Sequence, residues 1–202
     1  MTGHLYIVTA PSGAGKTTLV RLLLENDPGI RVSVSDTTRA ARAGERDGIE
    51  YHFVGVPEFL DKVRDGAFIE WAEVHGNYYG TSRSGIETAL HAGQDVILEI
   101  DWQGAQQVRR LFPAAIGVFI LPPSVDELER RLCARATDTA GTIARRVAAA
   151  REEMRHVGEF DYVIINDDLQ RALQDLLAVV VAARLCYADQ RQRHSILFSA
   201  LL

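Results

Sequence analysis

The chain of 202 residues is poor in cysteine and has no long apolar run. Its two cysteines, Cys133 and Cys186, lie far apart without a histidine cluster nearby, which argues against a zinc site and favours reduced thiols. No apolar stretch is long enough to span a bilayer, and the N-terminus lacks the features of a secretory signal. We therefore expect a cytoplasmic protein that does not enter a membrane.

The sequence also lacks an excess of basic residues. Its formal net charge is −5, which argues against broad binding of nucleic acid through a basic surface. An anionic ligand would have to meet locally clustered arginines, and such clusters occur at 39–46 and 130–155. The apolar fraction of 47% and the length suit one globular domain with a buried core.

Short apolar runs rich in β-branched residues predict strands at 5–9, 95–100, 116–121 and 162–165. Stretches of helical character lie between and after them, at 17–25, 103–111, 125–135, 142–157 and 169–185. Strands that alternate with helices predict an α/β fold, with a parallel sheet covered by helices on both faces. Ser124 and Asp168 are the expected N-caps of two of these helices.

The stretch from about 31 to 92 breaks this alternation. Its strand-like segments lie near 31–35, 51–54 and 67–75, with a short helix near 57–64. Such segments are typical of a mixed or antiparallel sheet, so we expect an inserted lobe. The final stretch, 187–202, begins polar and ends apolar, which fits either a helix on the core or a partner-binding tail.

Residues 10–17 read Ala-Pro-Ser-Gly-Ala-Gly-Lys-Thr and follow the first predicted strand. They match the phosphate-loop pattern of Gly, four residues and Gly-Lys-Ser/Thr, except that Ala10 replaces the first glycine. A chance glycine–lysine turn is the alternative. The phosphate loop is favoured because strand, loop and helix follow one another in the required order.

This loop predicts a binding site for a nucleoside triphosphate. Gly13 and Gly15 permit turns that aim backbone amides at phosphate oxygens. Lys16 can reach the β- and γ-phosphates, and the Thr17 hydroxyl can ligate Mg²⁺. The residues expected to hold the phosphates are Ala10, Pro11, Ser12, Gly13, Ala14, Gly15, Lys16 and Thr17.

A polar segment after the first helix carries Arg39 and Arg42, three residues apart among hydroxyl side chains. Guanidinium groups bind phosphate oxygens with two hydrogen bonds, and a tyrosine such as Tyr51 adds a donor. This group suits a phosphate monoester. A solvated loop of mixed charge would contain the same residues.

Glu70 lies in the alternating segment 67–75, on the face opposite Ile69 and Trp71. This spacing alone favours a solvent-facing carboxylate. The tyrosines of the segment 76–82 that follows could be ordinary packing residues.

Glu99 and Asp101 end the predicted strand at 95–100. Ligands bind at the carboxyl ends of parallel strands, so beside a phosphate loop Asp101 could hold Mg²⁺ directly or through water, with Glu99 contributing. The alternative is that one acid caps the next helix near Trp102 or Gln103.

Several arginines surround a polar, flexible interval at 137–142. A mobile lid that brings arginines over transferring phosphates would have this composition. Solvated helix faces would have it too, and the segment alone favours them. The arginines are Arg130, Arg131, Arg135, Arg145 and Arg146.

Together these segments resemble the guanylate kinase family of P-loop nucleoside monophosphate kinases, in its bacterial form. The resemblance covers nearly the whole chain in collinear order. Its motifs are the phosphate loop at 9–17, Ser33-Val34-Ser35, Thr37-Thr38-Arg39, Arg42-Ala43-Gly44-Glu45, Tyr51-His52-Phe53-Val54, Gly76-Asn77-Tyr78-Tyr79-Gly80, Ile100-Asp101-Trp102-Gln103-Gly104 and Asn166-Asp167-Asp168.

The resemblance implies ATP-dependent phosphorylation of GMP to GDP, with dGMP used similarly or less well. It implies that Glu70 binds guanine, that Lys16, Arg39, Arg135 and Arg146 are catalytic, that Asn166 lies near adenine, and that Thr17 and Asp101 hold Mg²⁺. The implied GMP-binding residues are Ser35, Arg39, Arg42, Tyr51, Glu70, Tyr79, Thr81, Glu99 and Asp101.

On this basis the single domain divides into a core, a GMP-binding lobe and a lid. The core is expected at about 1–30, 93–134 and 158–202, the lobe at 31–92 and the helical lid at 135–157. A kinase-inactive binding module and a related kinase of a sugar phosphate are the alternatives. We expect ATP and GMP as partners and no nucleic acid; a homo-oligomer is compatible with this sequence.

Overall fold

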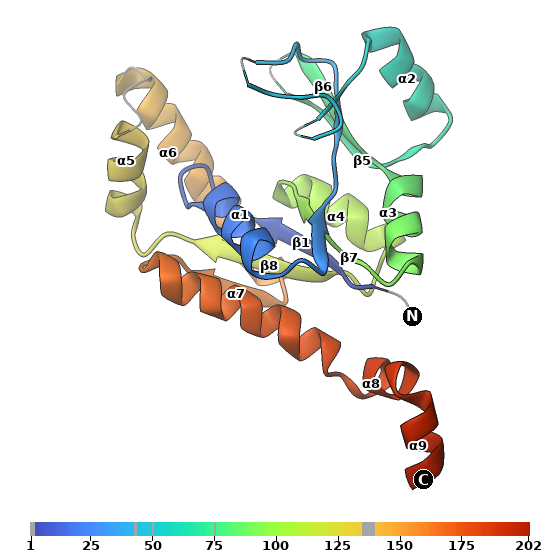
Figure 1. Cartoon of the computed structure of the whole chain (residues 1–202). Helices are drawn as coiled ribbons and strands as arrows, with labels where there is room; N and C mark the ends of the chain where they lie inside the picture. The colour runs from blue at the N-terminus through green and yellow to red at the C-terminus, as the bar shows by residue number, and fades with distance from the viewer. Residues whose placement is uncertain (1–2, 43, 50, 75, 135–139) are drawn as a thin grey trace.

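The computed structural model describes the chain except for residues 1–2, 43, 50, 75 and 135–139. At its centre is a parallel sheet in the order β2-β7-β1-β8-β9 (Figure 1). The loop after the central strand β1 therefore opens at the middle of the sheet's carboxyl edge, where ligands bind in such folds. The strands are β1 (Leu5–Thr9), β2 (Ile30–Val32), β7 (Asp95–Glu99), β8 (Ile116–Leu121) and β9 (Tyr162–Ile165).

Helices cover both faces of this sheet, as the sequence predicted. The alternation along β1 explains the two layers, because Tyr6 and Val8 join one buried cluster while Leu5 and Ile7 join the other. Each large side chain buried in this way contributes roughly 1.5–3 kcal/mol. The covering helices are α1 (Lys16–Asn26) and α7 (Leu169–Arg184) on the first face, and α3 (Arg83–His91) and α4 (Trp102–Leu111) on the second.

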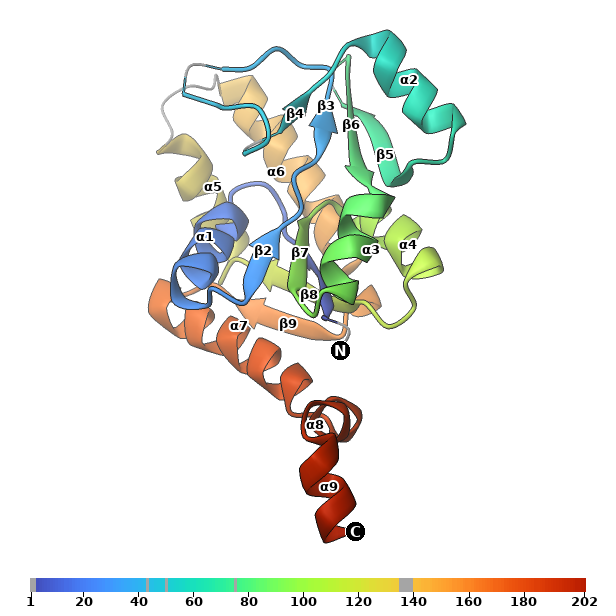
Figure 2. The same cartoon turned by 45° about the vertical axis from the view of Figure 1, so that its right-hand side comes forward.

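A second sheet, in the order β4-β3-β6-β5, lies beyond α3 (Figure 2). Its β3–β4 pair is parallel and its other pairs are antiparallel, so the sheet is mixed. Phe59 of α2 (Val56–Arg64) fixes that helix on the sheet by stacking on Phe68 and Tyr78. The strands are β3 (Asp36–Thr37), β4 (His52–Phe53), β5 (Phe68–Val74) and β6 (Asn77–Ser82). We call this sheet with α2 the lobe.

The stretch 31–92 is divided between the two sheets, so the prediction that its segment at 31–35 belongs to the sheet of the lobe is wrong. Its first strand, β2, pairs with β7 in the parallel sheet, and its last helix, α3, also packs on β7. The lobe strands lie between Asp36 and Ser82. The chain therefore enters the lobe through residues 33–35 and leaves it where β6 runs into α3.

The helices α5 (Val125–Cys133) and α6 (Ala140–Met154) form a separate small layer around Leu128, Leu132 and Ala150. The α6 helix ends three residues before its predicted end because the chain turns into a 3₁₀ helix, η1 (Val157–Glu159). Both predicted N-caps are confirmed. Ser124 accepts a hydrogen bond from the Glu127 amide at 3.0 Å, and Asp168 accepts one from the Arg171 amide at 2.8 Å.

The chain ends in two short helices, α8 (Tyr187–Arg193) and α9 (Ser195–Leu201), which extend away from the body of the molecule (Figures 1 and 2). The tail is helical, but it does not lie on the core as one prediction had it. Ile196 on α9 is 87% exposed. No described helix is both long and apolar enough to cross a membrane.

Candidate active site

The loop between β1 and α1 has the conformation that its glycines permit. Gly13 and Gly15 have φ values of 94° and 97°, in the left-handed region that side chains with a Cβ avoid. A Cβ on Gly15 would also overlap the amide nitrogen of Asn166. That amide donates a buried hydrogen bond of 2.7 Å to the Ala14 carbonyl. Asn166 therefore braces the loop from β9, a role that the sequence did not predict.

Lys16 and Thr17 begin α1 directly after this loop. Burial lowers the pKa of the Lys16 ammonium, while nearby Glu99 and Asp101 favour its charged form. The Thr17 hydroxyl donates a 3.2 Å hydrogen bond to Glu99. Asp101 instead accepts the Gly104 amide at 2.8 Å as the N-cap of α4, as the capping alternative predicted.

The α6 helix brings two charged residues to the loop. Arg146 donates a 2.7 Å hydrogen bond to the Ser12 hydroxyl. Glu153 lies seven residues further along the same helix, and burial and Asp101 raise the pKa of its carboxyl, whereas Lys16 and the Ser12 backbone lower it. Residues two turns apart share one helix face, which is the sequence signal for Glu153. Arg135, also predicted here, lies outside the described residues.

Glu70 is buried, 8% exposed, so the solvent-facing position that its spacing favoured is wrong. The β5 register shifts between Phe68 and Glu70, and α4 packs over this strand so closely that a Cβ on Gly104 would lie 3.4 Å from Glu70 Oε2. Burial raises the pKa of Glu70 to about 7. Thr81 donates a hydrogen bond to the carboxylate, and Ser35 lies 3.2 Å from the Thr81 hydroxyl.

The loop after β3 holds Arg39 against aromatic rings and a carboxylate. Its guanidinium carbon lies 5.5 Å from the centre of the Tyr51 ring, and Tyr51 packs edge-on against Tyr79. Both carboxylate oxygens of Glu45 accept Arg39 Nη2 at 2.9 Å. Glu45 also accepts a 2.7 Å hydrogen bond from the Arg42 backbone amide, and this bond is the main cause that lowers the pKa of the Glu45 carboxyl.

Glu45 had no predicted role, although it follows the two arginines in one short loop with charge of the opposite sign. The Arg42 side chain itself is exposed.

A cavity of about 450 Å³ lies between the parallel sheet and the lobe. Predicted residues from both parts line it: Lys16, Thr17, Ser35, Tyr51, Thr81 and Glu99. Glu70, Arg39 and Tyr79 connect to this lining through the contacts to Thr81 and Tyr51. The structure thus gathers most of the predicted GMP-binding set around one space, next to the phosphate loop.

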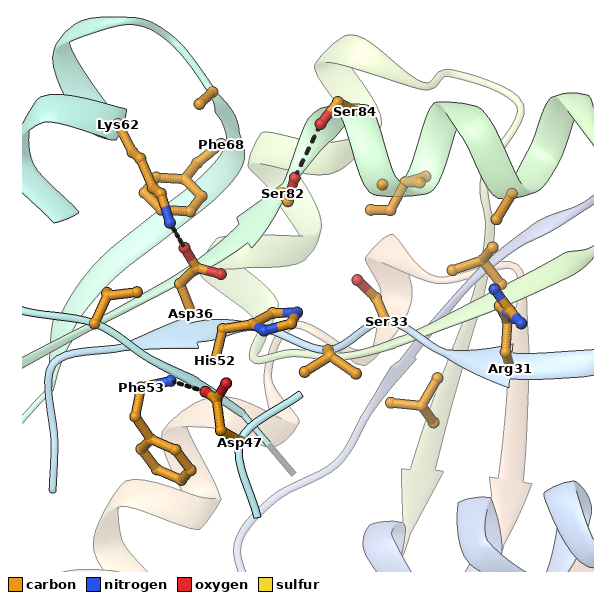
Figure 3. Close-up of a pocket in the computed structure, with 18 of the residues that line it drawn as sticks. Arg31, Ser33, Asp36, Asp47, His52, Phe53, Lys62, Phe68, Ser82 and Ser84 are labelled. Carbon is orange, nitrogen blue, oxygen red and sulfur yellow. Dashed lines mark hydrogen bonds and ion pairs between the residues drawn. The ribbon is translucent and has the colours of Figure 1, made fainter. Parts of the chain in front are cut away.

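A larger cavity, of about 740 Å³, shares Val32 and Ser33 with the first and extends toward α2 and α3 (Figure 3). Lys62 and Asp36 are paired at its wall at 2.8 Å, and Ser82 lies 3.3 Å from Ser84. Among the described residues, its lining contains none of the predicted site residues. The smaller cavity is therefore the candidate active site.

A glycine-rich loop at the centre of a parallel sheet, followed by Lys16 and Thr17 on a helix, defines a P-loop protein that binds nucleotide phosphates. Known protein families identify the chain more closely within this class. The family model for guanylate kinase matches residues 2–183. The chain therefore belongs to the guanylate kinase family.

Named relatives agree with this assignment. The chain is 62% identical to the guanylate kinase of Dechloromonas aromatica over the full length of both chains. It is 63% identical to that of Aromatoleum aromaticum over 96% of this chain and 95% of the relative. The crystal structure of guanylate kinase from Anaplasma phagocytophilum matches with a TM-score of 0.75 at 36% identity, over 92% of this chain and 88% of that one.

Proposed function

We propose that this chain transfers the γ-phosphate of ATP to GMP, giving ADP and GDP. One observation supports this most: a buried carboxylate, Glu70, is joined through Thr81 to a cavity that Lys16 also lines. Family membership and the names of the relatives support the same reaction.

Guanine recognition follows from the chemistry of Glu70. The ionised carboxylate accepts the N1–H and the 2-amino group of guanine, while Thr81 and Ser35 hold it in place. Adenine has neither donor on that edge and would leave a buried carboxylate unpaired, which costs far more than one lost contact. We expect dGMP to be used similarly or less well, because Glu70, Thr81 and Ser35 recognise the base and not the sugar.

The GMP phosphate is assigned to Arg39, Arg42, Tyr51 and Tyr79. Arg39 is already oriented by Glu45, by the Ala40 carbonyl and by the face of Tyr51, so its guanidinium group is positioned to meet phosphate oxygens.

The ATP phosphates are assigned to the loop amides, Lys16 and Arg146, with Arg135 as a further arginine. The Asn166 side chain is engaged by the loop, and its place near adenine stays a prediction.

The residues beside the loop fit Mg²⁺. Thr17 and Glu99 offer a hydroxyl and a carboxylate oxygen 3.2 Å apart. So small a set of protein ligands suits a cation that completes its shell with substrate phosphates and water. When bound, Mg²⁺ neutralises charge on the phosphates of ATP. Asp101 is a further candidate through water.

The transfer itself is an in-line displacement. An oxygen of the GMP phosphate attacks the γ-phosphorus, and the bond from that phosphorus to the ADP oxygen breaks. Lys16, Arg39 and Arg146 stabilise negative charge on the moving group, and the phosphate nucleophile needs no protein base. Exclusion of water from the closed site prevents hydrolysis of ATP.

We further propose that the lobe binds GMP and that α6 belongs to a lid, so that the domain works in three parts. The reaction is assigned to the cytoplasm, where both nucleotides are available.

A coupled assay tests the reaction, with GMP, AMP, UMP, CMP and sugar phosphates as acceptors. We expect the highest kcat/KM with GMP. Highest activity with any acceptor other than a guanine nucleotide would overturn the proposal. A kinase-inactive binding module is not favoured, because the phosphate loop, Arg39, Arg42 and Arg146 are all present.

A further inference from the structure

The α6 helix is fastened to α4 by an aromatic stack outside the substrate cavity. The rings of Trp102 and His156 are nearly parallel, at 7°, with their centres 3.5 Å apart. Trp102 is the first residue of α4, and His156 lies in the turn directly after α6. The stack therefore joins the start of one helix to the end of the other.

The edge of the same imidazole also has a polar partner. His156 Nδ1 lies 2.7 Å from Glu159 Oε1, and the other oxygen of Glu159 accepts the Gln106 side-chain amide at 2.8 Å. Gln106 lies one turn after Trp102 on α4. Two neighbouring residues of α4 thus hold His156, one directly and one through Glu159. We call Trp102, Gln106, His156 and Glu159 the α4–α6 clamp.

Both helices held by the clamp lead to the candidate active site. Asp101 caps α4 immediately before Trp102, after Glu99 at the end of β7. On α6, Arg146 and Glu153 face the phosphate loop through Ser12. The α6 helix also packs on α5 through Ala150, which lies between Arg146 and Glu153 on the same face of α6. The orientation of α6 therefore decides where the Arg146 guanidinium lies.

A clamp at the end of α6 would act on Arg146 through a lever. Arg146 precedes the last residue of α6, Met154, by about 12 Å along the helix axis, given a rise of about 1.5 Å per residue. At that length a tilt of about 5° displaces Arg146 by about 1 Å. A misplacement of about 1 Å in a group that positions reactants can lower a rate about 100-fold.

From this geometry we infer that the α4–α6 clamp positions Arg146 for phosphoryl transfer, with Trp102 and His156 as its positioning residues. The inference rests on the proposed function and adds to it residues that touch no substrate. It predicts that loss of the clamp lowers kcat while leaving the binding of GMP in the lobe nearly unchanged.

A double-mutant cycle on the full-length protein tests this. We expect Trp102→Leu and His156→Leu each to lower kcat at least tenfold and to change the KM for GMP less than about twofold. In an Arg146→Ala background, either substitution should lower kcat less than about twofold further, because the residue it positions is already gone. Trp102→Phe retains a ring face and should recover most of the activity.

Controls separate the clamp from a loss of folding. His91→Leu replaces an exposed histidine at the end of α3 and should leave kcat within about twofold. Circular dichroism and thermal unfolding check each variant. The two clamp substitutions lie in different elements, at the start of α4 and in the turn after α6, so one local folding defect would not account for both.

Two results would overturn the inference alone: losses that multiply independently in the Arg146→Ala background, or an unchanged kcat in folded clamp variants. A wild-type chain that does not phosphorylate GMP would instead overturn the proposed function, and this inference with it.

Discussion

The recognition role that we propose for Glu70 is combined with an unfavourable environment for its charge. Its carboxyl is buried, and burial raises its pKa to about 7, so near neutral pH it is close to half protonated before substrate binds. Guanine brings two donors, which only the ionised form can accept together. We therefore expect GMP to select the ionised form and to lower this pKa on binding.

The affinity for GMP should follow this titration. Below pH 7 the protonated carboxyl presents a donor to the donors of guanine, so affinity falls, and at pH 6 it should be about tenfold lower than above pH 8. Isothermal titration between pH 5.5 and 8.5 measures this. The GMP phosphate itself titrates near pH 6, and this contribution is the same with the control variant Glu70→Gln, which lacks the carboxyl. Parallel pH profiles for the two proteins would contradict the prediction.

The same carboxyl should reduce the stability of the folded chain. A carboxyl pKa that is higher in the folded state lowers the free energy of unfolding as pH rises from the unfolded value, near 4.3, to about 7, and the loss stays complete above that. Glu70→Gln should therefore increase the free energy of unfolding at pH 8 by about 1–3 kcal/mol, with little effect at pH 4. Urea titration at both pH values measures it, and Glu73→Gln, exposed on the same strand, should change neither by more than about 0.5 kcal/mol.

At the scale of elements, the phosphate loop depends on a strut from β9. Asn166 follows that strand, and its amide fills the space next to Gly15 while bonding to the Ala14 carbonyl. The loop conformation is thus fixed by a residue some 150 positions away along the chain. This contact lies at the phosphate loop, separate from the lobe.

Removal of the strut should weaken ATP binding selectively. Asn166→Ala leaves a buried carbonyl without its donor, a cost of about 1–3 kcal/mol, and we expect the KM for ATP to rise about tenfold with the KM for GMP within twofold. Asn26→Ala, which removes a comparable but exposed side-chain bond to the Leu22 carbonyl, should leave both constants unchanged. An equal rise in both KM values after Asn166→Ala would count against the strut.

The α7 helix is anchored by a charge network at its last residue. Arg184 bonds to Asp27 at 2.6 Å, beyond α1, and to Asp95 at 2.7 Å, at the start of β7. The Arg184 side chain is 23% exposed, so the pairs are largely shielded from water. Asp95 also accepts the His4 amide at 2.7 Å, which ties in the start of the chain.

Breaking this network should destabilise the fold measurably. Arg184→Ala leaves two carboxylates without their cationic partner. Because the site keeps some contact with water, we expect the free energy of unfolding to fall by about 2 kcal/mol, less than the roughly 3–5 kcal/mol of a fully buried pair. Arg171→Ala on the same helix removes an exposed pair and should cost less than about 0.5 kcal/mol. Urea denaturation of both variants decides it; equal losses would show that burial does not govern these pairs.

For the molecule as a whole, four strands of the parallel sheet were predictable, whereas the place of β2 and the contacts between parts were not. The four strands are short apolar runs and the phosphate loop has a local pattern, so neighbouring residues carry the information. The burial of Glu70 depends on α4, more than thirty residues later in the chain, and the burial could not be derived from the alternation within β5. The pairing of Trp102 with His156 is likewise long-range. The strands β3 and β4 have two residues each, too few for a periodic signal.

The arrangement of the two sheets predicts a change in overall dimensions. The chain passes between the parallel sheet and the lobe at residues 33–35 and at the β6–α3 junction, and the cavity between the two parts is lined by residues of both. Saturation with GMP and a non-hydrolysable ATP analogue should therefore bring the parts together. We expect small-angle X-ray scattering to give a smaller radius of gyration with both ligands than without. An unchanged radius at saturation would indicate a site that is already closed.

The positions of the two tryptophans have a practical consequence. Trp71 lies on β5 of the lobe and is 41% exposed, whereas Trp102 is stacked on His156 between α4 and α6. Each indole thus samples a different part of the molecule. Replacing one of them by phenylalanine leaves a single tryptophan, so selective excitation of that indole can follow the responses to GMP and to ATP separately without any attached dye.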